Sequence, residues 1–441
     1  MKLKTIYICQ NCEQESPKWT GKCPGCNAWN SFVEDVINIG KSDISSTPRN
    51  IKTSKPESLG DVDRNTRNTG EKTLSGIKEF DRVVGDGILD GSLVLLSGEP
   101  GIGKSTLTLQ LAGKMAKKKR TLIVSGEESV HQIASRAKRL NIKEANLSVI
   151  NEFNLETALE TIRKEKAEFV IIDSIQVISS LNLPGTAGTI SQVRYCTEQI
   201  METAKKYNIP IMIIGHVTKD GNLAGPKVLE HLVDTVIQLE GDRFQQFRIL
   251  RASKNRFGCC SEVGIFEMTE KGMEEVKNPS EQFLEGRKKN VIGSNITVAI
   301  EGTRPFLVEV QALVSTSPFG YPKRTANGFD LNRLQILLAV LQKYAKLNLQ
   351  NQDVFINVVG GIKLNEPAAD LAVITAVASS FLKKALSFDS VTFGEVGLTG
   401  EIRKISHSEK RTKEAKKLGF TKIICPENFK EINEVLEKLG N

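Results

Sequence analysis

The fold is decided by the stretch Leu93-Val94-Leu95-Leu96-Ser97-Gly98-Glu99-Pro100-Gly101-Ile102-Gly103-Lys104-Ser105-Thr106. It begins as an apolar run typical of a buried strand and changes to a glycine-rich turn that ends in lysine and serine. A strand, a glycine loop and a helix in this order is the context of the Walker A motif, Gly-x4-Gly-Lys-Ser/Thr. We therefore expect a strand to end near Gly98 and a helix to begin near Lys104.

This motif predicts a site for a nucleoside triphosphate, ATP in the simplest case. Glycines let backbone N–H groups surround the β-phosphate, and the N-terminus of the following helix adds a favourable partial charge. Lys104 is expected to reach the β- and γ-phosphates, and the Ser105 hydroxyl to bind Mg²⁺. The predicted nucleotide-binding residues are Gly98, Glu99, Pro100, Gly101, Ile102, Gly103, Lys104, Ser105 and Thr106.

Further apolar runs extend this pattern outward. Helical patterns separate the runs Thr121–Val124, Phe169–Ile172 and Ile211–Ile214. Near-continuous β-branched runs spaced by helices indicate a parallel sheet that is covered on both faces. We predict an α/β domain with a mainly parallel sheet over residues 69–276.

Polar residues follow three of these runs. Asp173 ends an apolar strand and is a Walker B candidate that would hold Mg²⁺ through water. Glu127, or else Glu128, is a candidate general base that orients the attacking water. The alternative is that both acids cap the following helix. His216 is either a sensor of the γ-phosphate or a structural histidine.

The N-terminal segment, residues 1–33, carries Cys9-x-x-Cys12 and Cys23-x-x-Cys26. Two such pairs complete a tetrahedral shell of four thiolates, which is typical of Zn²⁺. A segment this short has little core, so metal binding would supply much of its folding energy. Four protein ligands leave no position for water, so the site is structural in character. Four free cysteines or a redox dithiol are the alternatives.

Composition and linkers complete the outline of the chain. The net charge of +8 permits a polyanionic partner without requiring one. No apolar run approaches the length of a membrane span, and we expect a cytoplasmic protein without membrane contact. Residues 34–68 and 277–290 are predicted linkers. Residues 291–441 mix strands with helices, one of which carries a leucine stripe that comprises Leu331, Leu334, Leu337, Leu338 and Leu341.

A second motif, Lys254-Asn255-Arg256-Phe257-Gly258, resembles the signature pentapeptide of the RadA (Sms) family of bacterial DNA-repair proteins. The order of motifs around it is also similar, and the resemblance covers almost the whole chain. Besides the four-cysteine ribbon, it includes Leu74-Ser75-Gly76-Ile77, Ser125-Gly126-Glu127-Glu128-Ser129, Gly215-His216-Val217-Thr218-Lys219 and Ala224-Gly225-Pro226-Lys227-Val228-Leu229-Glu230-His231.

The resemblance implies a RecA-like motor core that assembles as a homo-hexameric ring, as replicative DnaB-type helicases do. Such proteins use ATP and single-stranded DNA to drive branch migration of recombination intermediates, and the resemblance implies the RecA recombinase as a partner. A cation from the neighbouring subunit completes the nucleotide site in such rings. Lys254 and Arg256 are the candidates, and ordinary charge at a strand edge is the alternative.

Two loops are candidates for DNA contact in the channel of the ring. The first runs over 183–188 and leads to Gln192 and Arg194, and the second runs over 219–227. Arg194, Lys219 and Lys227 are expected to contact phosphates without reading sequence. Solvated loop charge is the competing interpretation.

The last 150 or so residues resemble the proteolytic domain of the Lon family, which uses a Ser-Lys pair. Ala368 stands in the matching position of the serine, and Glu409 stands where the lysine is expected. Without a hydroxyl and its base there is no acyl-enzyme route, so we expect a scaffold rather than a peptidase. Besides the DNA motor and the ATP-dependent peptidase, a third possible class of function is a RecA-like switch of the KaiC type.

The C-terminal segment also carries a basic run, which is either a DNA-contacting surface or a solvated helix face. It comprises Arg403, Lys404, Lys410, Arg411, Lys413, Lys416 and Lys417.

Overall fold

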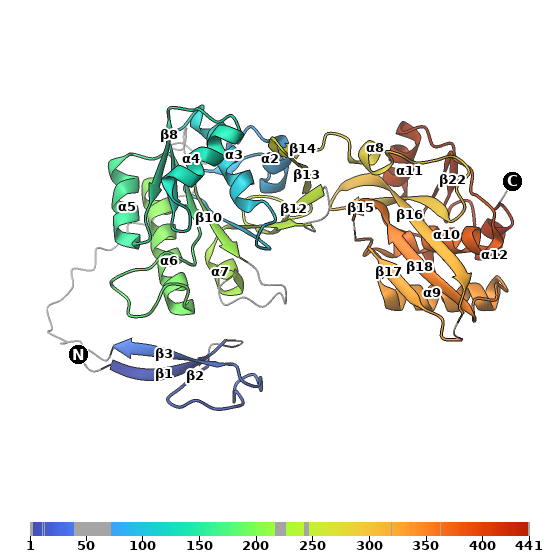
Figure 1. The fold of residues 1–441 in the computed structure, drawn as a ribbon, viewed down its shortest axis with the longest axis horizontal. Coiled ribbons are helices and arrows are strands. Elements are labelled where there is room, and N and C mark those ends of the chain that lie inside the picture. Colours follow the sequence, from blue (N-terminus) through green and yellow to red (C-terminus); the bar gives the residue numbers. More distant parts are fainter. Residues whose placement is uncertain are drawn as a thin grey trace, which may run out of the picture. The chain divides into compact units, whose positions relative to one another are not determined.

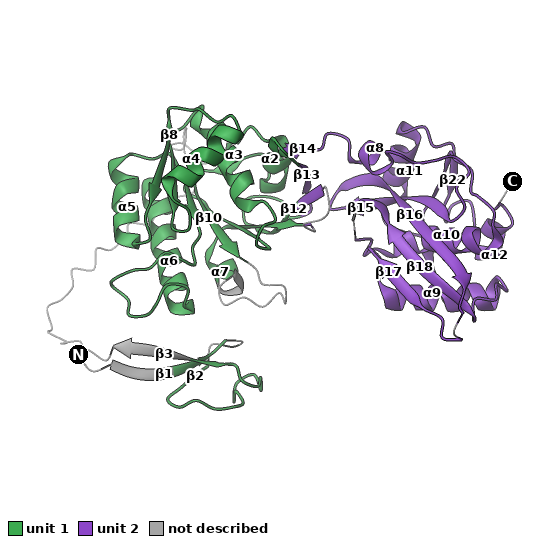
Figure 2. Cartoon of the chain, in the orientation of Figure 1, with its two compact units in different colours: residues 1–240, 250–260, 269–273 green, residues 241–249, 261–268, 274–441 purple. Residues whose placement is uncertain are grey.

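The computed structural model describes residues 3–10, 12, 14–38, 72–216, 226–241, 247–318, 320–361 and 363–439. These residues form two compact units (Figure 2). Unit 1 comprises Met1–Glu240, Leu250–Cys260 and Thr269–Met273, and unit 2 comprises Gly241–Ile249, Ser261–Met268 and Glu274–Asn441. The two units therefore alternate along the chain between residues 241 and 273, whereas the sequence suggested a single boundary at residue 276.

The large sheet is built around the Walker A strand. Its order is β14-β13-β12-β11-β6-β10-β9-β7-β8, and β6 lies parallel between β10 and β11. The other neighbours on that side, β9, β7 and β8, are also parallel. The predicted α/β class with a mainly parallel sheet is confirmed. The elements, drawn in Figure 1, are β4 (Lys72–Thr73), α2 (Lys78–Val84), β5 (Ile88–Leu89), β6 (Leu93–Gly98), α3 (Lys104–Ala116), β7 (Thr121–Ser125), α4 (Val130–Arg139), β8 (Leu147–Asn151), α5 (Leu155–Lys164), β9 (Phe169–Asp173), α6 (Ile190–Tyr207), β10 (Ile211–His216), α7 (Pro226–Leu232), β11 (Thr235–Glu240), β12 (Phe247–Asn255), β13 (Val263–Thr269) and β14 (Gly272–Glu275).

Helices cover both faces of this sheet (Figure 1). Alternate strand residues, such as Leu93, Leu95 and Val124, share one buried cluster with α5, α6 and α7. Helix α3 packs on the sheet through its contacts with β6, β7, β8 and β9. Strands that are buried on both faces explain why the apolar runs lack alternation.

The N-terminal ribbon is a three-stranded antiparallel sheet of order β2-β1-β3, with β1 (Leu3–Cys9), β2 (Glu15–Ser16) and β3 (Phe32–Asn38). The register pairs Leu3 with Asn38 and Cys9 with Phe32. The predicted ribbon boundary at residue 33 is therefore too early, because the ladder with β1 continues to Asn38. The rest of the predicted linker up to residue 68 lies outside the described residues.

Unit 2 is built on the sheet β15-β16-β18-β17. Helix α10 is buried over most of its length, which fits a sequence that is apolar around its whole circumference. The elements are α8 (Pro279–Phe283), β15 (Ser294–Glu301), β16 (Arg304–Thr316), β17 (Arg324–Asn327), α9 (Leu331–Tyr344), β18 (Gln352–Val358), η1 (Val359–Gly361), η2 (Pro367–Ala369), α10 (Asp370–Leu382), β19 (Ser390–Thr392), β20 (Glu395–Val396), β21 (Ile402–Arg403), α11 (Ser408–Lys417), β22 (Lys422–Ile424) and α12 (Ile432–Leu436).

Two sequence expectations about unit 2 need correction. Leu331 begins α9 and is exposed, whereas the other four leucines of the predicted stripe are buried. The predicted linker 277–290 contains α8, and Phe283 of this helix is buried against Phe247 and Phe306, with ring centroids 4.9 and 5.8 Å away. The segment is polar in composition, but one aromatic residue anchors it in the core.

No helix in the described ranges combines the length and the apolar character that crossing a bilayer requires.

The aromatic anchor predicts a stability effect. Phe283→Ala removes a fully buried ring and leaves a cavity, so we expect the free energy of unfolding of unit 2 to fall by about 3–5 kcal/mol. Denaturant unfolding of the full chain measures the change, with Leu398→Ala, at a side chain that is 69% exposed, as the control. Equal effects of the two substitutions would show that 277–290 behaves as a linker after all.

Candidate nucleotide-binding site

The glycine loop follows directly from the buried strand β6. Gly98, Gly101 and Gly103 have φ angles of 156°, 79° and 116°, a region that residues with side chains rarely adopt. A Cβ atom on Gly98 would lie 2.6 Å from the carbonyl oxygen of Leu239, so β11 leaves no room for a side chain there. The loop closes on itself through the N–H groups of Ile102 and Thr106, which donate to the carbonyls of Glu99 (3.3 Å) and Gly103 (3.1 Å).

Lys104 turns back over this loop. Its Nζ donates to the carbonyl oxygens of Gly98 at 2.8 Å and Glu99 at 3.0 Å. Burial lowers the pKa of the Lys104 ammonium, and the carboxylates of Asp173 and Glu127 oppose that shift. The lysine therefore places a cation at the loop, hydrogen-bonded to neutral carbonyls that a phosphate can replace.

Asp173 lies next to the Walker A serine. The Ser105 hydroxyl donates to the Asp173 carboxylate. Burial raises the pKa of Asp173, the bond from Ser105 opposes this, and the nearby charges of Glu127 and Glu128 raise it further. A buried carboxylate beside a hydroxyl, with other acids close by, is a set of oxygen donors that suits Mg²⁺.

Glu127 reaches the same place from the neighbouring strand. The Gly126 N–H donates to the Asp173 carbonyl at 2.8 Å, which joins the ends of β7 and β9. A Cβ atom on Gly126 would lie 2.3 Å from Cγ2 of Val177, so only glycine fits at this junction. Glu127 Oε1 accepts a hydrogen bond from Ser174 Oγ and lies 3.1 Å from His216 Nε2. Ser174 was not singled out from the sequence, although it directly follows Asp173.

Glu128 has a different environment. Its Oε1 pairs with Arg136 Nη2 at 2.5 Å. The Ser125 hydroxyl and the Asn151 amide hold its backbone, with Asn151 Nδ2 donating to the Glu128 carbonyl at 3.0 Å. Helix α4 is capped by Ser129 in a capping box with Gln132, so the alternative in which the two acids cap this helix is wrong.

The pentapeptide Lys254 to Gly258 ends β12 and continues into the turn after it. Arg256 has a half-exposed side chain, and its Nη1 lies 3.7 Å from Oδ1 of the buried Asp234. Asn255 is a structural residue, because its Nδ2 donates to the Val84 carbonyl at 3.1 Å and its Oδ1 accepts from the Phe257 N–H at 3.0 Å. Arg256 is the one cation of this motif whose side chain is largely open to solvent.

Lys254 is bound within its own subunit. Its Nζ donates to the carbonyl oxygens of Glu230 (2.6 Å), Val233 (2.9 Å) and His231 (3.4 Å) at the C-terminal end of α7. Burial and the charge of Arg256 lower the pKa of Lys254, and Asp234 and Glu230 oppose them. A lysine at this end of a helix satisfies carbonyl groups that have no partner within the helix.

Of the two proposed DNA loops, the structure describes all of the first and only the end of the second. Gln192 is fully buried, and its Nε2 donates to the carbonyls of Ser180 and Leu183 at 3.1 and 2.6 Å, so it holds the first loop together. Arg194 is half exposed on α6 and pairs with Glu198 at 3.2 Å. Lys219 and the side chain of Lys227 lie outside the described residues.

The four ribbon cysteines converge as metal ligands must. All four Sγ atoms lie within 4.8 Å of one another, with Cys9 and Cys26 at 3.6 Å and Cys12 and Cys23 at 3.4 Å. A tetrahedral shell with metal–sulfur bonds of about 2.3 Å places its sulfurs about 3.8 Å apart. The residues therefore fit a tetrahedral ion such as Zn²⁺.

In unit 2, Ala368 is buried in η2 and Glu409 is exposed on α11. The buried cation of α11 is Arg411, which pairs with Glu366 through two bonds and also donates to the Val298 carbonyl. Arg411 therefore does not belong to the basic surface that the sequence suggested, whereas the other six cations of that run are exposed. The sequence does not predict the burial of Arg411, because nothing in the sequence of a basic helix marks which residue faces inward.

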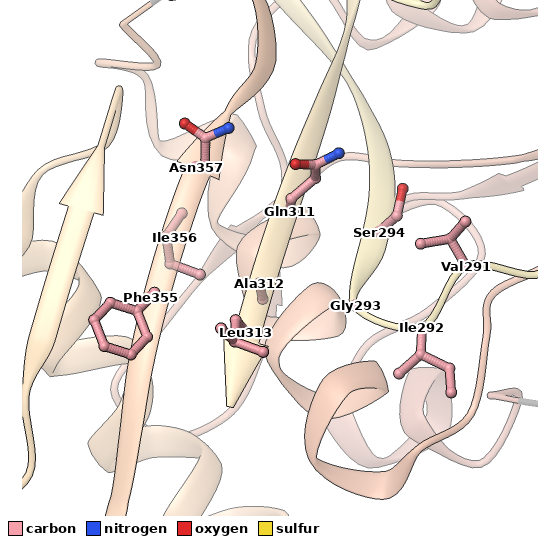
Figure 3. Close-up of a pocket in the computed structure, with 10 residues that line it drawn as sticks. All are labelled: Val291, Ile292, Gly293, Ser294, Gln311, Ala312, Leu313, Phe355, Ile356 and Asn357. Atoms are coloured by element: carbon pink, nitrogen blue, oxygen red, sulfur yellow. The ribbon is translucent and has the colours of Figure 1, made fainter. Parts of the chain in front are cut away.

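A hollow of about 370 Å³ lies on the sheet of unit 2 (Figure 3). Leu313, Phe355 and Ile356 come from the neighbouring strands β16 and β18, and no charged residue lines the hollow. Its single hydroxyl, that of Ser294, donates to Glu309 at 2.5 Å. The lining therefore offers an apolar surface without an acid, a base or a free nucleophile.

Three family models match different parts of the chain. The family model described as ATPase, KaiC, matches residues 73–279. The model described as rubredoxin metal binding domain matches residues 7–34, and the model described as subunit ChlI of Mg-chelatase matches residues 322–428. No Lon model is among these three, so the likeness of unit 2 to Lon proteases stays a prediction.

Full-length relatives share one description. The DNA repair protein RadA of Bacillus subtilis is 48% identical over 428 residues, which cover 96% of this chain and 93% of that protein. RadA of Streptococcus pyogenes serotype M3 is 48% identical over 448 residues, which cover 100% and 97% of the two chains. A solved KaiC-like protein from Pyrococcus horikoshii is 21% identical, with a TM-score of 0.40 over 47% of this chain and 99% of its own.

Proposed function

The chain belongs to the RadA family of DNA repair proteins, and from this premise we propose that it is a DNA-dependent ATPase that moves along single-stranded DNA and promotes branch migration of recombination intermediates. The observation that carries the proposal is the meeting of Lys104, Ser105, Asp173 and Glu127 at one edge of the sheet. The same unit presents the family pentapeptide on the turn after β12.

ATP and Mg²⁺ would be held by the parts already described. The loop amides bind the β-phosphate, Lys104 exchanges its two carbonyl partners for phosphate oxygens, and Ser105 with Asp173 positions the ion. Phosphoryl transfer needs little covalent help from a protein, so these residues act by position and charge. The burial of Lys104 strengthens its attraction for the transferred phosphate.

Glu127 is our candidate for the residue that orients water. It shares the edge of the sheet with Asp173, and its direct partners are the Ser174 hydroxyl and the His216 imidazole. Glu128 already pairs with the Arg136 guanidinium within its own unit. His216 bridges Glu127 to β10, so we propose that it senses the γ-phosphate through this carboxylate.

A second subunit would complete the site. We assign Arg256 as the cation that reaches the neighbour's γ-phosphate, because its guanidinium is half exposed and lies on the turn after β12. Lys254 acts differently, as a positioning residue that ties this turn to α7. Helix α7 directly follows the second DNA loop, so movement at the neighbour's phosphate is transmitted to DNA. A homo-hexameric ring satisfies this arrangement.

The remaining assignments follow the family and the residues together. Zn²⁺ fills the four-cysteine ribbon as a structural ion. Arg194, Lys219 and Lys227 contact DNA phosphates in the channel, RecA recombinase is a partner, and the protein acts in the cytoplasm. Unit 2 acts as a scaffold and not as a peptidase, because Ala368 has no nucleophile to offer.

The KaiC match over 73–279 keeps one other class in view, a switch in which ATP turnover regulates assembly. The two classes differ in their response to DNA. For the motor, single-stranded DNA should raise the ATPase rate several-fold, and Lys104→Ala should abolish turnover with and without DNA because the phosphates lose their cation. ATPase assays across a salt series measure both. A rate indifferent to DNA, with no salt-dependent binding, would favour the switch.

Substitutions of the two adjacent acids, Glu127 and Glu128, should have clearly different effects on ATP turnover. Glu127→Gln keeps the shape of the side chain but removes the base, so turnover should fall by about 100-fold or more while ATP still binds. Glu128→Gln, the matched control, should leave turnover within a few-fold and lower stability modestly, since Arg136 loses its partner. Single-turnover hydrolysis and nucleotide-binding assays distinguish them, and the reverse order of effects would exchange the two roles.

Substitutions of the two pentapeptide cations, Lys254 and Arg256, should also have different effects on turnover and translocation. Arg256→Ala should lower turnover by about 1,000-fold, the scale of a lost arginine finger. Lys254→Ala should retain nucleotide binding and basal turnover but lose stimulation by DNA and translocation, because α7 is released from the turn.

Lys271→Ala, at an exposed lysine on the β13–β14 turn, is the control and should behave as the parent chain does. Mixing Arg256→Ala with Lys104→Ala subunits tests whether the cation acts across a subunit boundary. Recovery of activity in the mixture requires it, and normal translocation by Lys254→Ala rejects the coupling role.

A further inference from the structure

The ribbon presents two large apolar side chains to solvent. Trp19 is 54% exposed and Trp29 is 73% exposed, and they are the only two tryptophans of the chain. Neither belongs to the small buried cluster of the ribbon, which comprises Cys9, Cys23 and Phe32 with Tyr7 packed on it. Exposed indoles that do not support a core mark a surface that meets another molecule.

The two rings converge on one point of the backbone. A Cβ atom on Gly21 would lie 3.9 Å from each indole ring, so both rings reach the same bare stretch of chain. Residues 21–30 form a short hairpin in which Lys22 pairs opposite Trp29 and the Asn30 N–H donates to the Gly21 carbonyl at 2.8 Å. The backbone thus fixes the position of the pair.

The charged residues between 16 and 31, the segment that carries both rings, have one sign. Lys18 and Lys22 are exposed, and the ammonium of Lys22 lies 5.8 Å from the centroid of the Trp29 ring. Residues 16–31 contain no acidic residue. Aromatic side chains interleaved with cations suit a strand whose bases stack on the rings while its phosphates meet the lysines.

We propose that Trp19, Trp29, Lys18 and Lys22 form a stacking platform for the bases of single-stranded nucleic acid, distinct from the channel loops of the ATPase domain. Only unpaired bases offer free faces, so the platform discriminates against duplex and reads no sequence. The proposal deepens the proposed function, since it takes the same DNA as its ligand. Cys23 and Cys26 lie within the hairpin, so the bound metal holds the platform in shape.

Tryptophan fluorescence tests this directly, because all of it comes from the ribbon. The zinc-loaded full chain, without nucleotide, is titrated with oligo-deoxythymidylate and with a duplex of equal length. We expect the single strand to quench the tryptophan emission strongly and the duplex to do so weakly. Trp19→Phe and Trp29→Phe each leave one reporter, and both should remain quenched.

Affinity provides the second readout, measured by anisotropy of a labelled oligonucleotide. Trp29→Ala should weaken binding of the single strand about tenfold, or about 1.4 kcal/mol, whereas Trp29→Phe should stay close to the parent. Lys22→Gln should reduce the salt dependence by about one phosphate contact. The control is Tyr207→Ala, which removes a 41% exposed ring with the Lys206 ammonium 5.5 Å from its centroid. Equal zinc content in all variants excludes loss of the ribbon fold.

Each outcome is decisive. If saturating single strand leaves the emission unchanged while ATPase stimulation persists, the platform is wrong and the motor function stands. If the emission is quenched but turnover ignores DNA, the platform stands and the motor function fails. Equal quenching by duplex rejects stacking. Emission that is shifted to the blue before DNA is added, and is insensitive to it, shows that the rings dock on protein and overturns the proposal.

Discussion

One backbone hydrogen bond organises the candidate nucleotide-binding site of this protein, the 2.8 Å bond from the Gly126 N–H to the Asp173 carbonyl. It joins the ends of two neighbouring parallel strands and thereby brings the carboxylates of Glu127 and Asp173 to one place. The bond requires a residue without a side chain, since Val177 occupies the space that a Cβ atom would need. Lys104 and Ser105 then approach the same place from the loop after β6, so a cation and a set of oxygen donors meet where a triphosphate can enter.

Three residues of the family pentapeptide have different contacts, which the sequence of the motif does not reveal. Asn255 holds the local backbone, Lys254 satisfies the end of α7, and Arg256 alone extends a half-exposed cation. Within one subunit, the turn that carries Arg256 is therefore already bonded to α7 through Lys254.

Part of this arrangement follows from sequence because it is local. Strand runs without alternation mark a sheet buried on both faces, and β6, β7, β9 and β10 formed where these runs stood. The pairs Cys9-x-x-Cys12 and Cys23-x-x-Cys26 specify a metal shell by spacing alone. The sequence patterns gave wrong predictions at two places, where one buried side chain did not follow the polar or basic composition of its segment. Phe283 draws a polar segment into a core, and Arg411 turns inward from a basic helix to pair with Glu366.

The sequence by itself determined the sheet, the phosphate loop and the four sulfur ligands, because the hydrophobic pattern and fixed spacings encode them within a few residues. Only the tertiary structure shows that Glu127 and Glu128 have different partners, Ser174 for one and Arg136 for the other, because adjacent residues cannot reveal which partner comes from a distant strand or helix. The same holds for Lys254 and Arg256, and for the convergence of Trp19 and Trp29 over Gly21. The physical reason is common to all three: burial and pairing depend on what folding brings alongside a residue.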